Sequence, residues 1–151
     1  MSAPPTQDER ERQLSEYMSR RASVIDIRVS NLHAELKNPA RVPPQPFSLR
    51  SSIETPVFER GSKHVVFNVG YHFSSADSRG QPAWDISFTL SLYFSFREDD
   101  DAPIEDNALK AFGARSVLEI AHPYARELVH NMTARMRVPA IILEVLPPLY
   151  R

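Results

Sequence analysis

Four stretches of this chain alternate between apolar and polar residues, a pattern typical of β-strands with one buried face. The clearest stretch covers residues 84–96, where every even position is apolar and most odd positions are small and polar. Alternate side chains of a strand share a face, which here gives seven apolar neighbours: Trp84, Ile86, Phe88, Leu90, Leu92, Phe94 and Phe96. We predict a strand that is strongly buried on that face.

Two further strands are predicted earlier in the chain. In residues 24–36 the apolar phase changes at Ser30-Asn31, which indicates a β-bulge. An extended crossover follows, because four prolines forbid regular structure there: Pro39, Pro43, Pro44 and Pro46. Residues 47–57 then place four apolar side chains on one face: Phe47, Leu49, Ile53 and Val57. Pro56 indicates an edge position or a strand end.

The remaining strand lies between these and residues 84–96. Its inward positions are five alternate apolar residues: Val65, Phe67, Val69, Tyr71 and Phe73. Short connections join the last three strands, so we predict that they pair as an antiparallel meander.

A long amphipathic helix is predicted from about Arg115 to Met136, after a short helix at 104–112. Pro123 removes one helical hydrogen bond, so it marks either a kink or the true start of the long helix. Its apolar stripe repeats every three or four residues: Val117, Ala121, Tyr124, Leu128, Met132 and Met136, widened by Ala125 and Val129.

Together these elements predict an α+β fold: a four-stranded antiparallel sheet, a proline-rich crossover after its first strand, and one long helix on the apolar face. Four strands about 4.8 Å apart make a sheet roughly 19 Å wide. A helix with its side chains is about 10 Å across. One helix therefore covers about half of the apolar face, and we expect another polypeptide to cover the rest, by self-association or in a groove.

The length of 151 residues suggests one domain. We expect residues 1–21 to form a flexible, charged N-terminal segment and residues 22–151 to form the domain. A formal net charge of −1 gives no general attraction to nucleic acid. The chain contains no cysteine, no apolar stretch long enough to insert into a membrane and no apolar segment typical of a signal peptide. We therefore expect a cytoplasmic protein.

Residues that could support catalysis or bind a metal form no recognisable motif. Glu127 and His130 have the spacing of a di-iron ligand pair, but such a site needs a second pair and further glutamates. Asp99 and Asp101 resemble a calcium loop that lacks its glycine and terminal glutamate. With 4 glycines in the chain, a backbone phosphate cradle is hard to build. We expect no catalytic site, no metal and no cofactor.

A motif in and after the long helix resembles the signature of the SecB export-chaperone family: His122-Pro123-Tyr124-Ala125-Arg126-Glu127, then Met132, Arg135, Pro139 and Leu143. Gly113-Ala114 is similar to the family's Gly-Ala before this helix, and the order of elements is similar from about residue 24 to residue 146. The resemblance implies a homotetramer, a dimer of dimers with helices between two sheets. It also implies apolar grooves that hold unfolded preproteins without ATP before they pass to the SecA motor.

The sequence departs from that family at several points. His122 stands where the family usually has an aromatic residue, and Met136 where a glycine commonly ends the helix. The sequence ends at Arg151 without the second helix and the C-terminal tail that contacts SecA, which puts an interaction with SecA in doubt. Some SecB-like proteins serve as chaperones of antitoxins, and a shortened variant suits that role too.

Two sets of candidate site residues follow. Groove positions that would bind a client polypeptide are apolar residues near the predicted rim and two adaptable methionines: Phe47, Leu49, Ile53, Met132, Met136, Ile141 and Leu143. Positions that would join subunits lie on the first strand and on the signature turn, where Arg126 and Glu127 form charge-assisted bonds or simply an ordinary helix face: Ile25, Ile27, Tyr124, Arg126, Glu127 and Leu128.

Three functions remain open at this point. The first is an ATP-independent holdase that binds many unfolded or precursor polypeptides and keeps them competent for translocation. The second is a dedicated chaperone or adaptor for one client, such as an antitoxin. The third is an acyl-thioester hydrolase of the hot-dog type, in which Glu119 or His122 would have to serve as the catalytic group.

Overall fold

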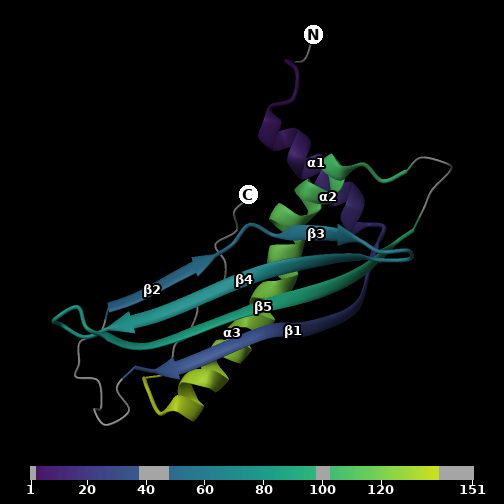
Figure 1. The fold of residues 1–151 in the computed structure, drawn as a ribbon. Helices are drawn as coiled ribbons and strands as arrows, with labels where there is room; N and C mark the ends of the chain where they lie inside the picture. The colour runs from purple at the N-terminus through teal and green to yellow at the C-terminus, as the bar shows by residue number, and fades with distance from the viewer. Residues whose placement is uncertain (1–2, 38–47, 98–102, 140–151) are drawn as a thin grey trace.

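The computed structural model describes residues 3–37, 48–97 and 103–139. In this part of the chain an antiparallel sheet lies against a run of helices that crosses behind it in Figure 1. The strands are β1 (Ala22–Leu36), β2 (Ser48–Ile53), β3 (Val57–Arg60), β4 (Val65–Ala76) and β5 (Pro82–Phe96). The helices are α1 (Gln7–Ser19), α2 (Asp106–Phe112), the π-helical turn η1 (Gly113–Val117) and α3 (Leu118–Met136). The predicted α+β class is confirmed.

The sheet has five strands but is only four strands wide. Its order is β1-β5-β4-β2, and β3 also pairs with β4, so that β2 and β3 together form one edge row. The sequence predicts a single strand for this row. Pro56 has no N–H with which to continue a ladder, and residues 54–56 separate the two strands.

This break also reverses the face of the edge row. Ile53 lies opposite Tyr71 and faces the core side of the sheet, as predicted. Beyond the break, Val57 lies opposite Asn68 on the outer side, and Phe58 lies opposite Phe67 on the core side. The prediction that Val57 faces inward is therefore wrong, because the irregular residues shift the two-residue period by one.

The two central strands bury the core as their alternation predicts. On β5, Trp84, Ile86, Phe88, Leu90, Leu92 and Phe94 are all buried, and Phe96 is half-buried. On β4 the five predicted inward residues are buried as well. The register pairs these residues directly, for example Phe67 with Leu92 and Phe73 with Ile86. The β-bulge expected near Ser30-Asn31 is confirmed, and β1 has a second register shift between Val24 and Asp26.

The helical layer is one run from residue 106 to 136, in which α2, η1 and α3 follow without a gap. Its buried stripe contains four residues of the predicted one, Val117, Ala121, Ala125 and Val129, together with Thr133, which was not predicted. Val117, Ala121, Ala125, Val129 and Thr133 repeat every four residues and are completely buried, while Tyr124 is 48% exposed. The small side chains allow the helix to lie close against the sheet, and the larger residues of the predicted stripe lie at its side.

Residues 1–21 are expected to be flexible, but the structure has a docked helix within them. Thr6 and Glu9 form a reciprocal capping box at the start of α1. Near its end, Met18 is completely buried in the core. On the same side, Asp8 accepts a hydrogen bond from the buried Arg115 of η1. The sequence of α1 is too weakly apolar to predict docking. The helix is nevertheless held in place by one buried methionine and by polar contacts.

The polar contacts include a chain of hydroxyl groups. Ser116 Oγ lies 2.7 Å from Ser15 Oγ and 2.7 Å from Ser19 Oγ. These hydrogen bonds determine which side of α1 faces η1. The opposite side of α1 therefore points away from η1.

Candidate functional site

The core side of the sheet is covered in its middle and open along both edges. β4 and β5 lie under the helix and are buried. On β1, Val24, Val29 and Leu32 have exposed fractions of 47%, 47% and 45%, although their partners are the core residues Phe94, Leu90 and Phe88. On β2, Leu49 and Ile53 are 49% and 39% exposed.

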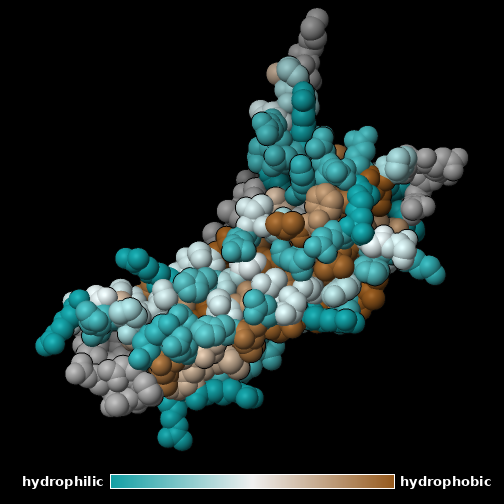
Figure 2. All heavy atoms as spheres, in the orientation of Figure 1, coloured by the Kyte–Doolittle hydropathy of each residue, from teal (hydrophilic) through white to brown (hydrophobic). Residues whose placement is uncertain are grey.

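We call these two open margins the β1 flank (Val24, Ile27, Val29 and Leu32) and the β2 flank (Leu49 and Ile53). Their side chains point to the same face as the core, but α3 does not cover them completely, because a single helix is narrower than the sheet. Figure 2 views the sheet from its outer side, where hydrophilic and neutral residues dominate, and apolar residues show along the lower edge that β1 forms. Exposed apolar strips of this kind are typical of interaction surfaces.

The β1 flank contains a shallow cavity of about 210 Å³ between β1 and α3. It brings together four of the six residues predicted to join subunits, Ile27, Tyr124, Glu127 and Leu128. The other two do not line it. Ile25 lies in the first bulge of β1 and is 57% exposed, and Arg126 is half-buried on α3.

The predicted groove residues are divided between the two flanks. Leu49 and Ile53 form the β2 flank. Met132 and Met136 are half-buried against the core, and they follow Leu128 at intervals of four residues, which places them on the same row of the helix. That row faces β1 rather than β2, because Leu128 lines the β1 cavity. Phe47, Ile141 and Leu143 lie outside the described residues.

Both margins of the sheet are edge strands. β1 begins the strand order, and β2 and β3 end it. An edge strand presents unpaired backbone N–H and C=O groups, which can pair with an added strand. Each flank therefore combines apolar side chains on the core face with a backbone edge beside them.

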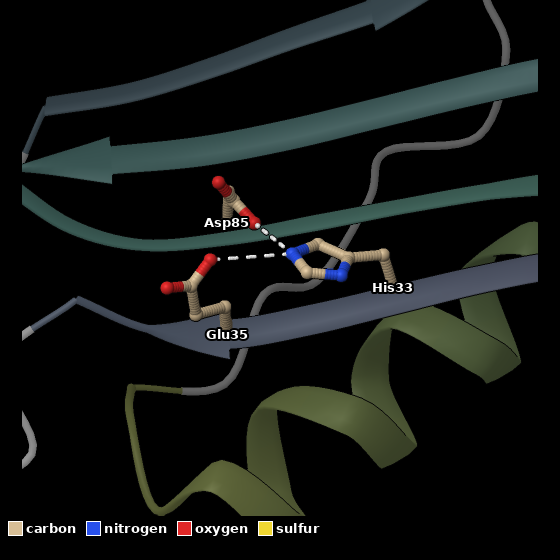
Figure 3. Close-up of side chains that lie close together, drawn as sticks. All are labelled: His33, Glu35 and Asp85. Atoms are coloured by element: carbon tan, nitrogen blue, oxygen red, sulfur yellow. Dashed lines mark hydrogen bonds and ion pairs between the residues drawn. The ribbon is translucent and has the colours of Figure 1, made fainter.

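A charged cluster on the outer side of the sheet escaped the sequence analysis (Figure 3). His33 Nε2 lies 3.3 Å from Glu35 Oε2 and 3.4 Å from Asp85 Oδ1. Glu35 lies opposite Asp85 in the β1–β5 register, and alternation places His33 on the same face. Only the pairing of the two strands reveals this cluster.

Lys37 is the fourth member of the cluster and places a positive charge beside the two carboxylates. Its Nζ lies 2.8 Å from Glu35 Oε2 and 3.1 Å from Asp85 Oδ2. The hydrogen bond from Lys37, followed by that from His33, lowers the pKa of Glu35, and the same carboxylates raise the pKa of Lys37. Three ligand atoms close enough to hold a metal ion are present, but the ammonium group of Lys37 already contacts both carboxylates and offsets one of their two negative charges.

The residues required for thioester hydrolysis lie in different surroundings. His122 is buried within α3, whereas Glu119 is exposed and lines a polar cleft between α1 and η1 with Arg12 and Arg20. Among the described residues, no helix is long and apolar enough to span a membrane.

Comparison with known proteins shows which solved structure this fold resembles. No protein-family model and no curated protein sequence matches the chain. A solved structure of the Mycobacterium tuberculosis Rv1957 SecB-like chaperone, in complex with a ChAD peptide from the Rv1956 HigA1 antitoxin, matches with a TM-score of 0.79. That match covers 91% of this chain and 99% of the other, at 20% sequence identity.

A Streptococcus agalactiae protein of unknown function also aligns, over 82% of this chain and 96% of its own, at 12% identity. Its TM-score of 0.38 is too low to indicate a shared fold. The order of elements, the position of the signature helix and the mycobacterial structure agree: this chain has the fold of the SecB-like chaperones.

Proposed function

We propose that this protein is an ATP-independent chaperone that binds unfolded or precursor polypeptides on its open flanks. The observation that carries the proposal is the partial cover of the core face, where five apolar side chains of the edge strands stay half-exposed. Full burial of such a side chain contributes about 1.5–3 kcal/mol. Covering the exposed halves on both flanks would therefore contribute about 4–7 kcal/mol in all, divided between subunit contacts and client binding and before the cost of ordering the client.

That gain is suited to a holding function. It corresponds to weak binding at any single segment, which a client can leave without ATP, and several flanks in one oligomer would increase the overall affinity. We propose that the β1 flank joins subunits, since its cavity contains Tyr124, Glu127 and Leu128 beside the edge of β1. The β2 flank would then face the client, and a homotetramer built as a dimer of dimers would present several such flanks.

Two versions of this function make different predictions. In the first, the protein holds many clients in the cytoplasm and keeps them competent for export. In the second, it is dedicated to one client. The second is favoured by a specific observation, the antitoxin peptide bound to the SecB-like chaperone whose fold this chain shares. Delivery to a SecA-type motor belongs to the first version only.

The test uses the full-length chain and a chemically unfolded protein diluted into buffer. Light scattering should show slower aggregation when the chain is present at an equal concentration, without ATP. Pull-down from the native host then separates the versions, because many unrelated clients support the first and one stoichiometric partner supports the second. A chain that leaves aggregation unchanged and binds no polypeptide contradicts the proposal.

A further inference from the structure

A second apolar depression, lined by none of the flank residues, lies between α1, α2 and β3. It has a volume of about 640 Å³ and is open to solvent. We call it the α1–β3 groove, and it is lined by Gln7, Arg10, Glu11 and Leu14 of α1, by Thr55, Pro56, Val57 and Phe58, and by Asn107, Lys110, Ala111 and Ala114. In Figure 2 apolar surface shows between the hydrophilic cap of α1 and the sheet.

The groove exists because α1 has two different sides. Asp8, Ser15 and Ser19 bind η1 on one side. Gln7, Arg10, Glu11 and Leu14 recur at the spacing of a single helix face, and this face forms one wall of the groove. Leu14 is 36% exposed there, and Val57 across the groove is 63% exposed.

The opposite wall offers a backbone edge. β3 pairs only with β4 among the described strands, and the ladder is interrupted just before it at Thr55 and Pro56. One side of β3 therefore presents N–H and C=O groups toward an added strand. A strand of four residues is about 13 Å long, which limits the pairing to a short extended segment.

Charge around the rim selects the kind of segment. Arg10 and Lys110 are exposed, and the structure shows no ion pair for either within the described ranges. Glu11 is the one acidic lining residue, so the lining carries a net charge of +1, from two cations and one anion. An acidic side chain next to an apolar one complements this arrangement.

We propose that the α1–β3 groove is a client subsite that takes an extended polypeptide segment in which apolar residues are flanked by acidic ones. This inference rests on the proposed chaperone function and extends it. The segment pairs with the free edge of β3, inserts an apolar side chain between Leu14 and Phe58, and directs its carboxylates to Arg10 and Lys110. The groove thus adds charge selectivity to binding that the flanks provide through apolar contact alone.

The test measures fluorescence anisotropy of a labelled peptide, Ser-Asp-Val-Phe-Val-Glu-Ser, with the full-length chain. A matched peptide carries lysine in place of both acidic residues. The wild type should bind the acidic peptide about tenfold more tightly than the lysine peptide. The double variant Arg10→Glu with Lys110→Glu should reverse that preference. Reversal excludes damage to the fold as the cause, because such damage weakens the binding of both peptides and cannot exchange their order.

The control is Arg50→Glu with Arg79→Glu, which makes the same change in net charge away from the groove. It should keep the wild-type preference. An equal loss of preference in this control overturns the proposal, because a general field effect would explain the result. Leu14→Asp should weaken the acidic peptide about tenfold, and circular dichroism checks that α1 remains helical.

Two further outcomes separate this inference from the function on which it rests. The wild type could prevent aggregation of an unfolded protein yet show no preference between the peptides. That result would overturn the proposed subsite in the α1–β3 groove and would leave the proposed chaperone function intact. If the wild type neither prevents aggregation nor binds either peptide, the proposed chaperone function is itself wrong. If the double variant instead changes the oligomeric mass, the occupant is a second copy of the chain and the proposal is wrong.

Discussion

The β2 flank gives the sharpest prediction for client binding. Leu49 and Ile53 are 49% and 39% exposed, so a bound client can bury roughly the half of each side chain that the fold leaves open. Since full burial is worth about 1.5–3 kcal/mol, each exposed half contributes about 1 kcal/mol. Replacing both by serine should remove about 2 kcal/mol of binding free energy, which is about a 30-fold increase in Kd.

The same substitutions affect the fold, because the other half of each side chain is already buried. We expect the free energy of unfolding to fall by about 2 kcal/mol as well. Val66→Ser is the matched control, since Val66 is half-buried on the outer side of the neighbouring strand β4. It removes a similar apolar group from the same sheet but leaves the core face unchanged, so its Kd should stay within twofold of the wild type.

The assay is titration of a labelled, permanently unfolded protein, with circular dichroism to confirm that each variant is folded. A folded double variant that binds as tightly as the wild type would refute the assignment of clients to the β2 flank. Equal weakening by Val66→Ser would refute it too, because the loss would then come from general destabilisation of the sheet.

Four other substitutions test the proposed subunit interface and the packing of the fold. Leu32→Glu places a charge in the β1 flank and should lower the oligomeric mass measured by analytical ultracentrifugation, and an unchanged mass would exclude the β1 flank as the interface. Asp8→Ala removes a partner of the buried Arg115 and should lower the free energy of unfolding by about 1–3 kcal/mol in urea titrations. Ala125→Leu overfills the helix–sheet contact and should cost about 1–3 kcal/mol, seen as a Tm several degrees lower. Burial raises the pKa of Tyr71 to about 12, so stability should be lost as the pH rises from about 10, where an unfolded tyrosine ionises, to about 12. Tyr71→Phe should make that loss smaller, and it should also raise stability, since the buried hydroxyl has no hydrogen bond with a described residue.

Strand content and the core could be predicted because period-two alternation reports directly on burial. The seven even positions of β5 show this most clearly, with six buried and Phe96 half-buried. The helix was harder to place. The predicted stripe contains the large Tyr124 and Leu128 as well as the small Ala121 and Ala125. The two alanines are the ones completely buried, because small side chains allow the helix to lie closer to the sheet.

Features that depend on distant parts of the chain could not be predicted. The cluster of His33, Glu35 and Asp85 arises only when β1 pairs with β5 in the observed register. Docking of α1 depends on Arg115, more than a hundred residues away. One signal was nevertheless present in the sequence: Thr6 followed three residues later by Glu9 is a capping-box pattern, and it marks the start of the helix.

The proposed function depends on one helix leaving the edges of the apolar face open for other polypeptides. Hydrogen-exchange mass spectrometry of the full-length chain, with and without an excess of unfolded client, tests it most directly. Amides of β2, at residues 48–53, should exchange more slowly when client is present, while those of the buried strand β5 should be unchanged. Identical exchange along β2 in both samples, under conditions where client is bound, would contradict it.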